Sequence, residues 1–146
     1  LEPSSAASDV YKRQVKRGIN ISYKNDGKNK YLIYGIENRI EQIIANLLDN
    51  AISFSDDNKD VIVQVSKSED NKVYIKILDE GQGFKEKDTN KIFKRFYSNR
   101  PDKFGQHSGL GLNIVKNLVD LHNATIKATN REDKKGASME IEFPKV

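Results

Sequence analysis

The sequence predicts an α+β fold, a two-layer α/β sandwich in which about three helices cover one face of a mixed, mostly antiparallel sheet. Two runs with alternating apolar residues, Val61–Val65 and Val73–Leu78, follow one another across a polar turn. A long amphipathic segment precedes them. A second segment with helical spacing, Leu110–Leu121, separates them from two closing strands. We therefore expect one sheet with helices packed against it.

The length and composition fit one domain. A chain of 146 residues can bury a single core. Cysteine is absent, which excludes disulfides and thiolate metal sites. No apolar run approaches the roughly 20 residues of a membrane span, and the first residues show no signal-peptide pattern. We expect the chain to be soluble.

The charge balance is modestly basic. Lys and Arg total 25 against 21 Asp and Glu, which gives a formal net charge of +4. Such an excess is compatible with a polyanion, either nucleotide phosphates or nucleic acid. Acidic residues interrupt most basic clusters, however, and no basic tract is interleaved with regularly spaced aromatic residues. No nucleic-acid partner is expected.

The first part of the chain divides into a flank and an expected hairpin. Residues 1–14 are small, polar and unpatterned, so we assign 1–16 to a flexible flank or linker and 17–146 to the folded domain. Ile19–Tyr23 alternates, Asn25-Asp26-Gly27 is a turn signal, and Lys30–Tyr34 resumes an extended run. This order predicts a β-hairpin that leads into a helix.

That helix carries two asparagines four residues apart. Its apolar face comprises Ile36, Ile40, Ile43, Leu47, Ala51 and Phe54, and the polar strip beside it comprises Gln42, Asn46, Asp49, Asn50 and Ser53. Residues at i and i+4 are neighbours on a helix, so the amide oxygens of Asn46 and Asn50 can converge on one target. Mg²⁺ shared with substrate phosphates would suit these oxygen ligands. The alternative is an ordinary solvated helix face.

The remaining elements follow from pattern. The two alternating runs are expected to be antiparallel neighbours. A short helix is expected at Asn90–Phe96, followed by a polar cover segment at Tyr97–Ser108. The last helix is Leu110–Leu121, and two strands close the chain at Ala124–Thr129 and Ser138–Phe143.

Two glycine-containing segments point to a ligand. Asp79-Glu80-Gly81-Gln82-Gly83-Phe84 ends a strand with an acid and two glycines, where backbone can approach a flat ligand and the acid can accept from the amine of adenine. Gly105–Leu112 runs into the last helix, whose free N–H groups favour phosphate. The alternative for the first is a plain turn. Neither spacing matches a P-loop or the dinucleotide-binding fingerprint.

Together these segments resemble the ATP-binding domain of sensor histidine kinases, a Bergerat fold of the superfamily that includes gyrase B, Hsp90 and MutL. The likeness covers Gly18–Pro144, nearly the whole chain after the flank. Five motifs in the family's order carry it: NLLDNA at Asn46–Ala51 (N box), DEGQGF at Asp79–Phe84 (G1), IFKRFY at Ile92–Tyr97 (F), SGLGLNIVK at Ser108–Lys116 (G2) and KGASMEIEFP at Lys135–Pro144 (G3). One such motif is weak, whereas five in order are highly specific.

The resemblance implies the cofactors ATP and Mg²⁺ and a role for each motif. Asn50 is then the principal magnesium ligand with Asn46 supporting, Asp79 anchors adenine, and Arg95 and Arg100 are candidate phosphate-neutralising cations. Asn46, Asn50 and Arg95 form the implied catalytic set. The implied nucleotide-binding set is Asn46, Asn50, Asp79, Gly81, Gly83, Phe84, Ser108, Gly109, Leu110, Gly111 and Leu112. The alternative for Arg95 is an ordinary surface charge.

Two positions depart from the family pattern. Ser53 stands where many members have a phosphate-contacting lysine, so that contact is missing or moved to Arg95 or Lys94. His107 stands in the cover segment where small residues are usual. Neither change removes nucleotide binding.

The resemblance also bears on the reaction. Relatives that hydrolyse ATP have a glutamate one turn before the magnesium asparagine, whereas this chain has Asn46, which cannot accept a proton. Transfer to a histidine, whose imidazole is largely neutral at pH 7, needs no such base. This favours a protein-histidine kinase over a stand-alone ATPase, a serine kinase or a non-catalytic regulatory module.

The acceptor histidine is not expected in this chain. His107 lies in the cover segment, and His122 at the end of the last helix is interpreted as a structural C-terminal cation or capping contact. The implied partners are a dimerisation and histidine-phosphotransfer domain of the parent kinase and a downstream response regulator. The expected location is the cytoplasm, and the parent can still be an inner-membrane sensor.

Overall fold

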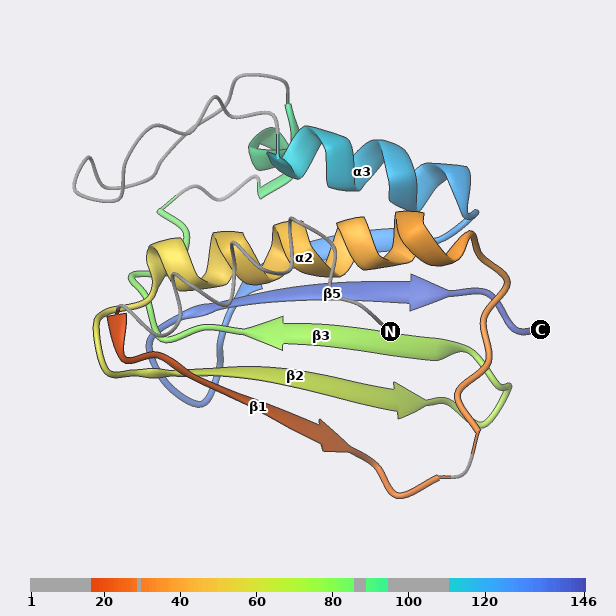
Figure 1. The fold of residues 1–146 in the computed structure, drawn as a ribbon, viewed down its shortest axis with the longest axis horizontal. Helices are drawn as coiled ribbons and strands as arrows, with labels where there is room; N and C mark the ends of the chain where they lie inside the picture. The colour runs from red at the N-terminus through yellow and green to blue at the C-terminus, as the bar shows by residue number, and fades with distance from the viewer. Residues whose placement is uncertain (1–16, 29, 86–88, 95–110) are drawn as a thin grey trace.

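The computed structural model describes residues 17–28, 30–85, 89–94 and 111–146. The predicted flank at 1–16 and the whole predicted cover segment at Tyr97–Ser108 lie outside the described residues. Figure 1 shows two layers, a five-stranded sheet with the helices on one side of it. The described elements are β1 Asn20–Asn25, α2 Glu37–Phe54, β2 Asp60–Lys67, β3 Val73–Leu78, the 3-10 helix η1 Thr89–Phe93, α3 Gly111–Leu121, β4 Thr125–Asn130 and β5 Ala137–Phe143.

The sheet is mixed and mostly antiparallel, as predicted. Its strand order is β1-β2-β3-β5-β4. Only the β1–β2 pair of this sheet is parallel, and the other three neighbouring pairs are antiparallel. The expected antiparallel pairing of the runs around 61–65 and 73–78 is confirmed. The α+β fold class is therefore confirmed.

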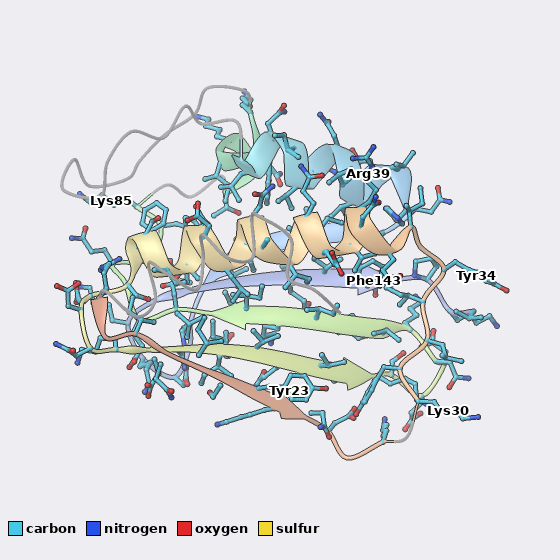
Figure 2. All side chains as sticks on the ribbon, viewed as in Figure 1. Tyr23, Lys30, Tyr34, Arg39, Lys85 and Phe143 are labelled. Carbon is cyan, nitrogen blue, oxygen red and sulfur yellow. The ribbon has the colours of Figure 1, made fainter. Side chains whose placement is uncertain are left out.

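Successive side chains of a strand point to opposite faces of the sheet, so every second residue faces the helices. Ile77 pairs with Met139, and Ile75 pairs with Ile141, so these residues share the inner face. Phe143 ends the row and is 1% exposed. Figure 2 shows Phe143 between the sheet and the helix layer, whereas Tyr34 points away from the domain. The core lies between the sheet and the helices.

The predicted hairpin at Ile19–Tyr34 is wrong. β1 pairs in parallel with β2, which requires a crossover through α2 instead of a tight turn. Asp26 does begin a turn, but its carboxylate accepts the N–H of Lys67 at the end of β2, 2.8 Å away. Residues 30–36 form neither helix nor strand. Their alternation has another cause, since Tyr31 and Ile33 pack on the core while Leu32 and Tyr34 are exposed.

Helix α2 is less exposed along its polar strip than a solvated face would be. Asn50 is 3% exposed and Ser53 is 4% exposed. The Ser53 hydroxyl donates to the carbonyl of Asp49. The last turn has no basic residue of its own, and Arg17 supplies a cation there by donating to the carbonyls of Ile52 and Ser55. The solvated-face alternative therefore fails at Asn50 and Ser53.

The shorter helices differ slightly from their expected bounds. The segment expected at Asn90–Phe96 is the 3-10 helix η1, and the last helix begins at Gly111 among the described residues. The amide of Asn113 donates to the carbonyl of Phe93, which joins the two helices. The Thr89 hydroxyl donates to the carbonyl of Ala128 in β4. No helix in the described ranges is long and apolar enough to cross a membrane.

His122 connects the end of α3 to the start of α2. Its Nδ1 lies 2.7 Å from the carbonyl oxygen of Leu118, and its Nε2 accepts the N–H of Ile36 at 3.1 Å. Because Nε2 is an acceptor, the ring is the neutral tautomer with hydrogen on Nδ1. The interpretation of His122 as a cation is therefore wrong, and its role as a capping contact is correct.

Replacing His122 should loosen this connection. In His122→Ala the N–H of Ile36 loses its acceptor, so we expect the free energy of unfolding to fall by about 2 kcal/mol. Urea unfolding followed by circular dichroism measures it. The neighbouring exposed Leu121→Ala is the control and should change stability by less than about 0.5 kcal/mol. Equal effects of the two substitutions would contradict the assignment.

Candidate functional site

The predicted site segments meet at one end of the domain. Figure 1 shows the C-terminal end of α2, the end of β3 and the start of α3 at the same end of the two layers. Asn46 and Asn50 lie in the C-terminal half of α2, Asp79 follows β3 directly, and Gly111 is the first residue of α3. An isolated bridge between Ser55 and Gly81 joins the end of α2 to the residues after β3. The fold therefore brings these segments together.

Asp79 is a buried acid with one committed oxygen. Its side chain is 3% exposed, and Oδ1 accepts the N–H of Gly81 at 2.9 Å and the N–H of Ala137 at 3.0 Å. No hydrogen bond from a described residue reaches Oδ2. Burial raises the pKa of the Asp79 carboxyl to about 6, against the opposing effect of these two N–H groups and of Arg131. At neutral pH Asp79 therefore offers an ionised acceptor.

Gly81 is required by packing against α2. A Cβ on Gly81 would lie 2.2 Å from the carbonyl oxygen of Phe54, so only glycine allows this approach. The N–H of Glu80, one residue earlier, donates to the hydroxyl of Ser55. Gly81 thus holds the residues after β3 against the end of the asparagine helix.

Gly83 and Phe84 are held by the end of β4. Gly83 has φ +76°, and a Cβ there would lie 2.6 Å from Oδ1 of Asn130. The Asn130 side chain accepts the N–H of Phe84 at 2.6 Å and donates to its carbonyl at 3.1 Å. This pair of bonds replaces a strand partner for Phe84. The second glycine of the motif therefore serves a contact within the chain.

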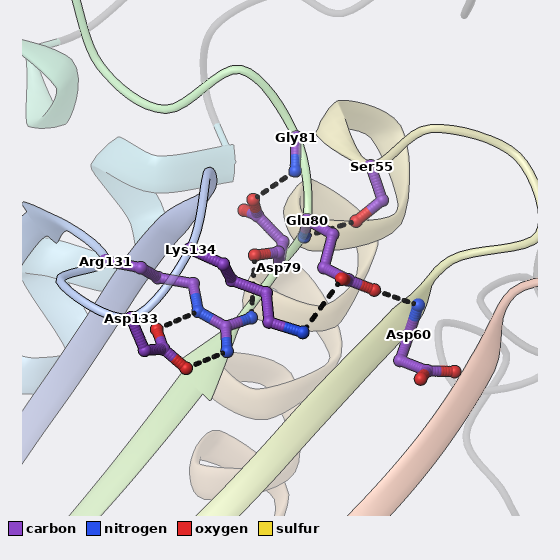
Figure 3. A network of polar contacts seen from close by, with 8 residues as sticks. All are labelled: Ser55, Asp60, Asp79, Glu80, Gly81, Arg131, Asp133 and Lys134. Carbon is purple, nitrogen blue, oxygen red and sulfur yellow. Dashed lines mark hydrogen bonds and ion pairs between the residues drawn. The ribbon is translucent and has the colours of Figure 1, made fainter.

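Glu80 continues the polar network on the other side of the strand end. Its carboxylate accepts the N–H of Asp60 at the start of β2, and it pairs with Lys134 at 3.2 Å. Figure 3 shows these contacts beside those of Asp79. The pKa of the Glu80 carboxyl is lowered, chiefly by the hydrogen bond from Asp60. Glu80 thus fixes the strand end while Asp79 faces inward.

No described residue crowds the first residue of α3. A Cβ on Gly111 would meet no described atom within 4 Å, and Leu112 packs partly against the core. Helix N-termini favour anions through free N–H groups and the helix dipole. Ser108, Gly109, Leu110 and the cationic candidates Arg95 and Arg100 lie outside the described residues, as does His107.

The comparisons with known proteins agree with this arrangement. The family described as "Histidine kinase-, DNA gyrase B-, and HSP90-like ATPase" matches residues 35–146, which is most of the chain. The chain belongs to this ATPase family. It is therefore an ATP-binding domain.

The curated relatives of this ATPase domain are sensor kinases. The chain is 36% identical over 128 residues to the sensor protein ChvG of Agrobacterium fabrum, covering 83% of this chain and 21% of that protein. It is 38% identical over 108 residues to the sensor protein KdpD of Clostridium acetobutylicum, covering 73% of this chain and 12% of that protein. The chain thus spans about a fifth or less of the length of these relatives.

Solved structures place the ATPase domain among histidine kinase catalytic domains. A nucleotide-free catalytic domain of the histidine kinase ThkA superposes with a TM-score of 0.75 at 26% identity, covering 94% of this chain and 90% of that one. The structure of ThkA in complex with the response regulator TrrA superposes with a TM-score of 0.74 at 23% identity, covering 97% of this chain and 40% of that one. The predicted resemblance to the ATP-binding domain of sensor histidine kinases is confirmed.

Reasoning from sequence missed Asn130 and Arg131 of the ATPase site, and it assigned Gly136 only to the G3 motif, with no role at the site. Asn130 holds Phe84, the Arg131 guanidinium donates to the carbonyl of Asp79 at 3.1 Å, and Gly136 packs against that same carbonyl. Arg131 is followed by Glu132-Asp133-Lys134-Lys135, which looks like an ordinary charged turn. The only local signal was Gly136, which closes that turn just before β5. Its φ of +146° requires glycine.

The raised pKa of Asp79 makes stability depend on pH. The Asp79 carboxyl has a pKa of about 6 in the folded protein and the ordinary value of 3.8 in the unfolded chain. Between pH 3.8 and about pH 6 the folded protein therefore binds a proton that the unfolded chain does not. The stabilisation is complete below 3.8 and is lost as pH rises through about 6, a fall of about 3 kcal/mol.

Asp79→Asn lacks this group and should lack this fall. Urea unfolding of both proteins from about pH 4 to pH 7 measures the difference, which should grow in favour of Asp79→Asn as pH rises. Parallel pH profiles for the two proteins would contradict the buried, proton-binding Asp79.

Proposed function

We propose that this chain is the ATP-Mg²⁺-binding catalytic domain of a two-component sensor histidine kinase, which donates the γ-phosphoryl group to a histidine on a separate dimerisation domain. The observation that carries the proposal is the buried Asp79 carboxylate with one oxygen left for a ligand. The sensor-kinase relatives support the kinase assignment.

Adenine recognition follows from the acceptor at Asp79. An ionised carboxylate only accepts hydrogen bonds, and the exocyclic amine of adenine is a donor at the edge of a flat base. Guanine has a carbonyl oxygen at the same ring position, which would face the carboxylate without a hydrogen. A buried unpaired acceptor costs binding free energy, so the site should discriminate between the two bases.

Asn50 and Asn46 are the residues that would hold Mg²⁺. Their amide oxygens are hard ligands, and no group of three or more His, Cys, Asp or Glu residues suited to a metal occurs in the described part of the chain. This donor set fits an ion that keeps water and phosphate ligands. Bound Mg²⁺ would neutralise phosphate charge. Asn50, buried near the end of α2, has the more fixed position.

The chain positions the nucleotide, and Asn46 supplies no base for an attacking water. Asn46 has an amide, which cannot take a proton from an attacking water, so hydrolysis should be slow. In transfer to histidine, an imidazole nitrogen forms a bond to the γ-phosphorus, the bond from that phosphorus to the β-γ bridging oxygen breaks, and ADP leaves. Such a transfer relies on alignment and charge neutralisation.

The acceptor histidine must come from outside the described residues. Both ring nitrogens of His122 are engaged, Nδ1 with Leu118 and Nε2 with the N–H of Ile36, and the residue is 9% exposed. It therefore cannot attack a phosphoryl group without breaking the contact between α3 and α2. A response regulator as the downstream partner is supported by the likeness to ThkA in its complex with TrrA.

The proposal is tested by phosphoryl transfer between separate domains. The chain, mixed with γ-labelled ATP and a dimerisation domain that carries an acceptor histidine, should label that domain and not itself. The control is the same dimerisation domain with alanine in place of its histidine. Label on the isolated chain would contradict the separate acceptor. Steady phosphate release without labelling would indicate an ATPase, and binding with neither would indicate a passive module.

Asn50→Asp tests the magnesium role. The substitution keeps an oxygen ligand but adds a charge that repels phosphate, so without Mg²⁺ we expect about tenfold weaker binding of a non-hydrolysable ATP analogue. With Mg²⁺ present the loss should be smaller. Isothermal titration at several Mg²⁺ concentrations measures this, with the exposed Asn117→Asp as the matched control. Equal losses with and without Mg²⁺ would contradict the assignment.

A further inference from the structure

The connection between β4 and β5, residues 131–136, packs directly on the backbone of Asp79. The Arg131 guanidinium donates through Nη1 to the Asp79 carbonyl at 3.1 Å. Just after the connection, Ala137 exchanges two hydrogen bonds with Asp79. Its N–H donates to the Asp79 carboxylate, and its carbonyl accepts the N–H of Asp79, both at 3.0 Å. The N–H, the carbonyl and the carboxylate of Asp79 are therefore all held from this one side. Figure 3 shows the contact from Arg131.

Arg131 is not an ordinary surface cation. Its side chain is 3% exposed, although it belongs to a charged turn. Asp133 holds the guanidinium in a two-point fork, with Nε 3.0 Å from Oδ1 and Nη2 2.8 Å from Oδ2. Such a planar fork fixes the orientation of the guanidinium. The third nitrogen, Nη1, is then directed at the carbonyl of Asp79.

Gly136 makes the approach possible. A Cβ on Gly136 would lie 2.0 Å from the carbonyl oxygen of Asp79 and 3.0 Å from Cδ of Arg131. Its own carbonyl accepts the N–H of Arg131 at 2.9 Å, which closes the connection on itself. The turn is therefore shaped so that the Arg131 fork and the Asp79 carbonyl meet.

We propose that Arg131 is a positioning residue for base recognition: held by Asp133, it fixes the Asp79 peptide and thereby directs the free carboxylate oxygen of Asp79 at the base. This inference rests on the proposed adenine-binding role of Asp79. Arg131 touches the backbone of Asp79 and is not itself a ligand for the nucleotide.

Arg131 also sets the charge around Asp79. The charged groups on the surrounding segments are Glu80, which binds the Asp60 N–H and Lys134, and Asp133, which is paired with Arg131. The charge that acts on Asp79 is that of Arg131. It stabilises the ionised carboxylate and so opposes the effect of burial, which raises the pKa of Asp79. Without it the pKa of Asp79 should rise. As the pH is lowered, the carboxylate would then be protonated, and adenine binding lost, at a higher pH than in the unmodified protein.

The test compares affinities for non-hydrolysable ATP and GTP analogues across pH. The variants are Arg131→Met, Arg131→Lys and Asp133→Asn, with Lys127→Met as the control for loss of one cation on exposed β4 surface. Asp133 is mostly exposed, so Asp133→Asn loosens the fork with little risk to folding. Urea unfolding of each variant is measured alongside.

Arg131→Met should bind the ATP analogue about tenfold more weakly, with the GTP analogue unchanged. The pH at which ATP-analogue binding declines should move up in Arg131→Met and stay in place in Arg131→Lys, which keeps the charge. Asp133→Asn should show a smaller loss in the same direction, and Lys127→Met none. A merely structural role would lower stability without changing the ratio of the two affinities.

The inference is overturned if folded Arg131→Met and Asp133→Asn retain the ATP preference of the unmodified protein, or if both analogues weaken equally. Asp79→Asn separates this failure from failure of the proposed function. Loss of ATP preference in Asp79→Asn alone would leave the adenine anchor standing and remove only the role of Arg131. An unchanged preference in Asp79→Asn would remove both.

Discussion

The burial of one carboxylate is the constraint on which the rest of the site depends. Asp79 is placed at the end of β3, almost fully excluded from water, where an ionised group is costly unless it is hydrogen-bonded. Two backbone N–H groups and a nearby guanidinium compensate the cost in part, and its pKa remains above the ordinary value. The uncommitted oxygen is what a ligand donor can use. A group so expensive to bury is better explained by binding than by stability.

Three glycines build the surroundings of that carboxylate before any nucleotide is bound. Gly81 lets the strand end touch the last turn of α2, Gly83 makes room for Asn130, and Gly136 brings the β4–β5 connection onto the Asp79 carbonyl. In each case a Cβ would meet a protein atom at 2.6 Å or less. The glycines of the motif are therefore explained by contacts within the fold. The asparagine helix, the acid and the closing strand become one unit through them.

Much of this could be predicted from the sequence, and the exceptions have physical causes. The spacing of apolar residues predicted β2, β3, α2, α3 and the two closing strands, because burial of one face of an element leaves a regular apolar pattern in the local sequence. The alternation at Lys30–Tyr34 was misleading, since it reflects one face packed on the core and carries no information about pairing. Arg131 and Asn130 were missed because their contacts with Asp79 and Phe84 join residues 52 and 46 positions apart. The asparagine pair was found because its spacing is local.

The central claim is that the Asp79 carboxylate receives the exocyclic amine of adenine. The most direct measurement is a double-mutant cycle between that amine and Asp79, with ATP compared against purine riboside triphosphate, which lacks the amine. The unmodified protein should bind ATP at least about tenfold more tightly than the analogue, and Asp79→Asn should bind the two within about twofold. An equal preference for ATP in both proteins would contradict the account.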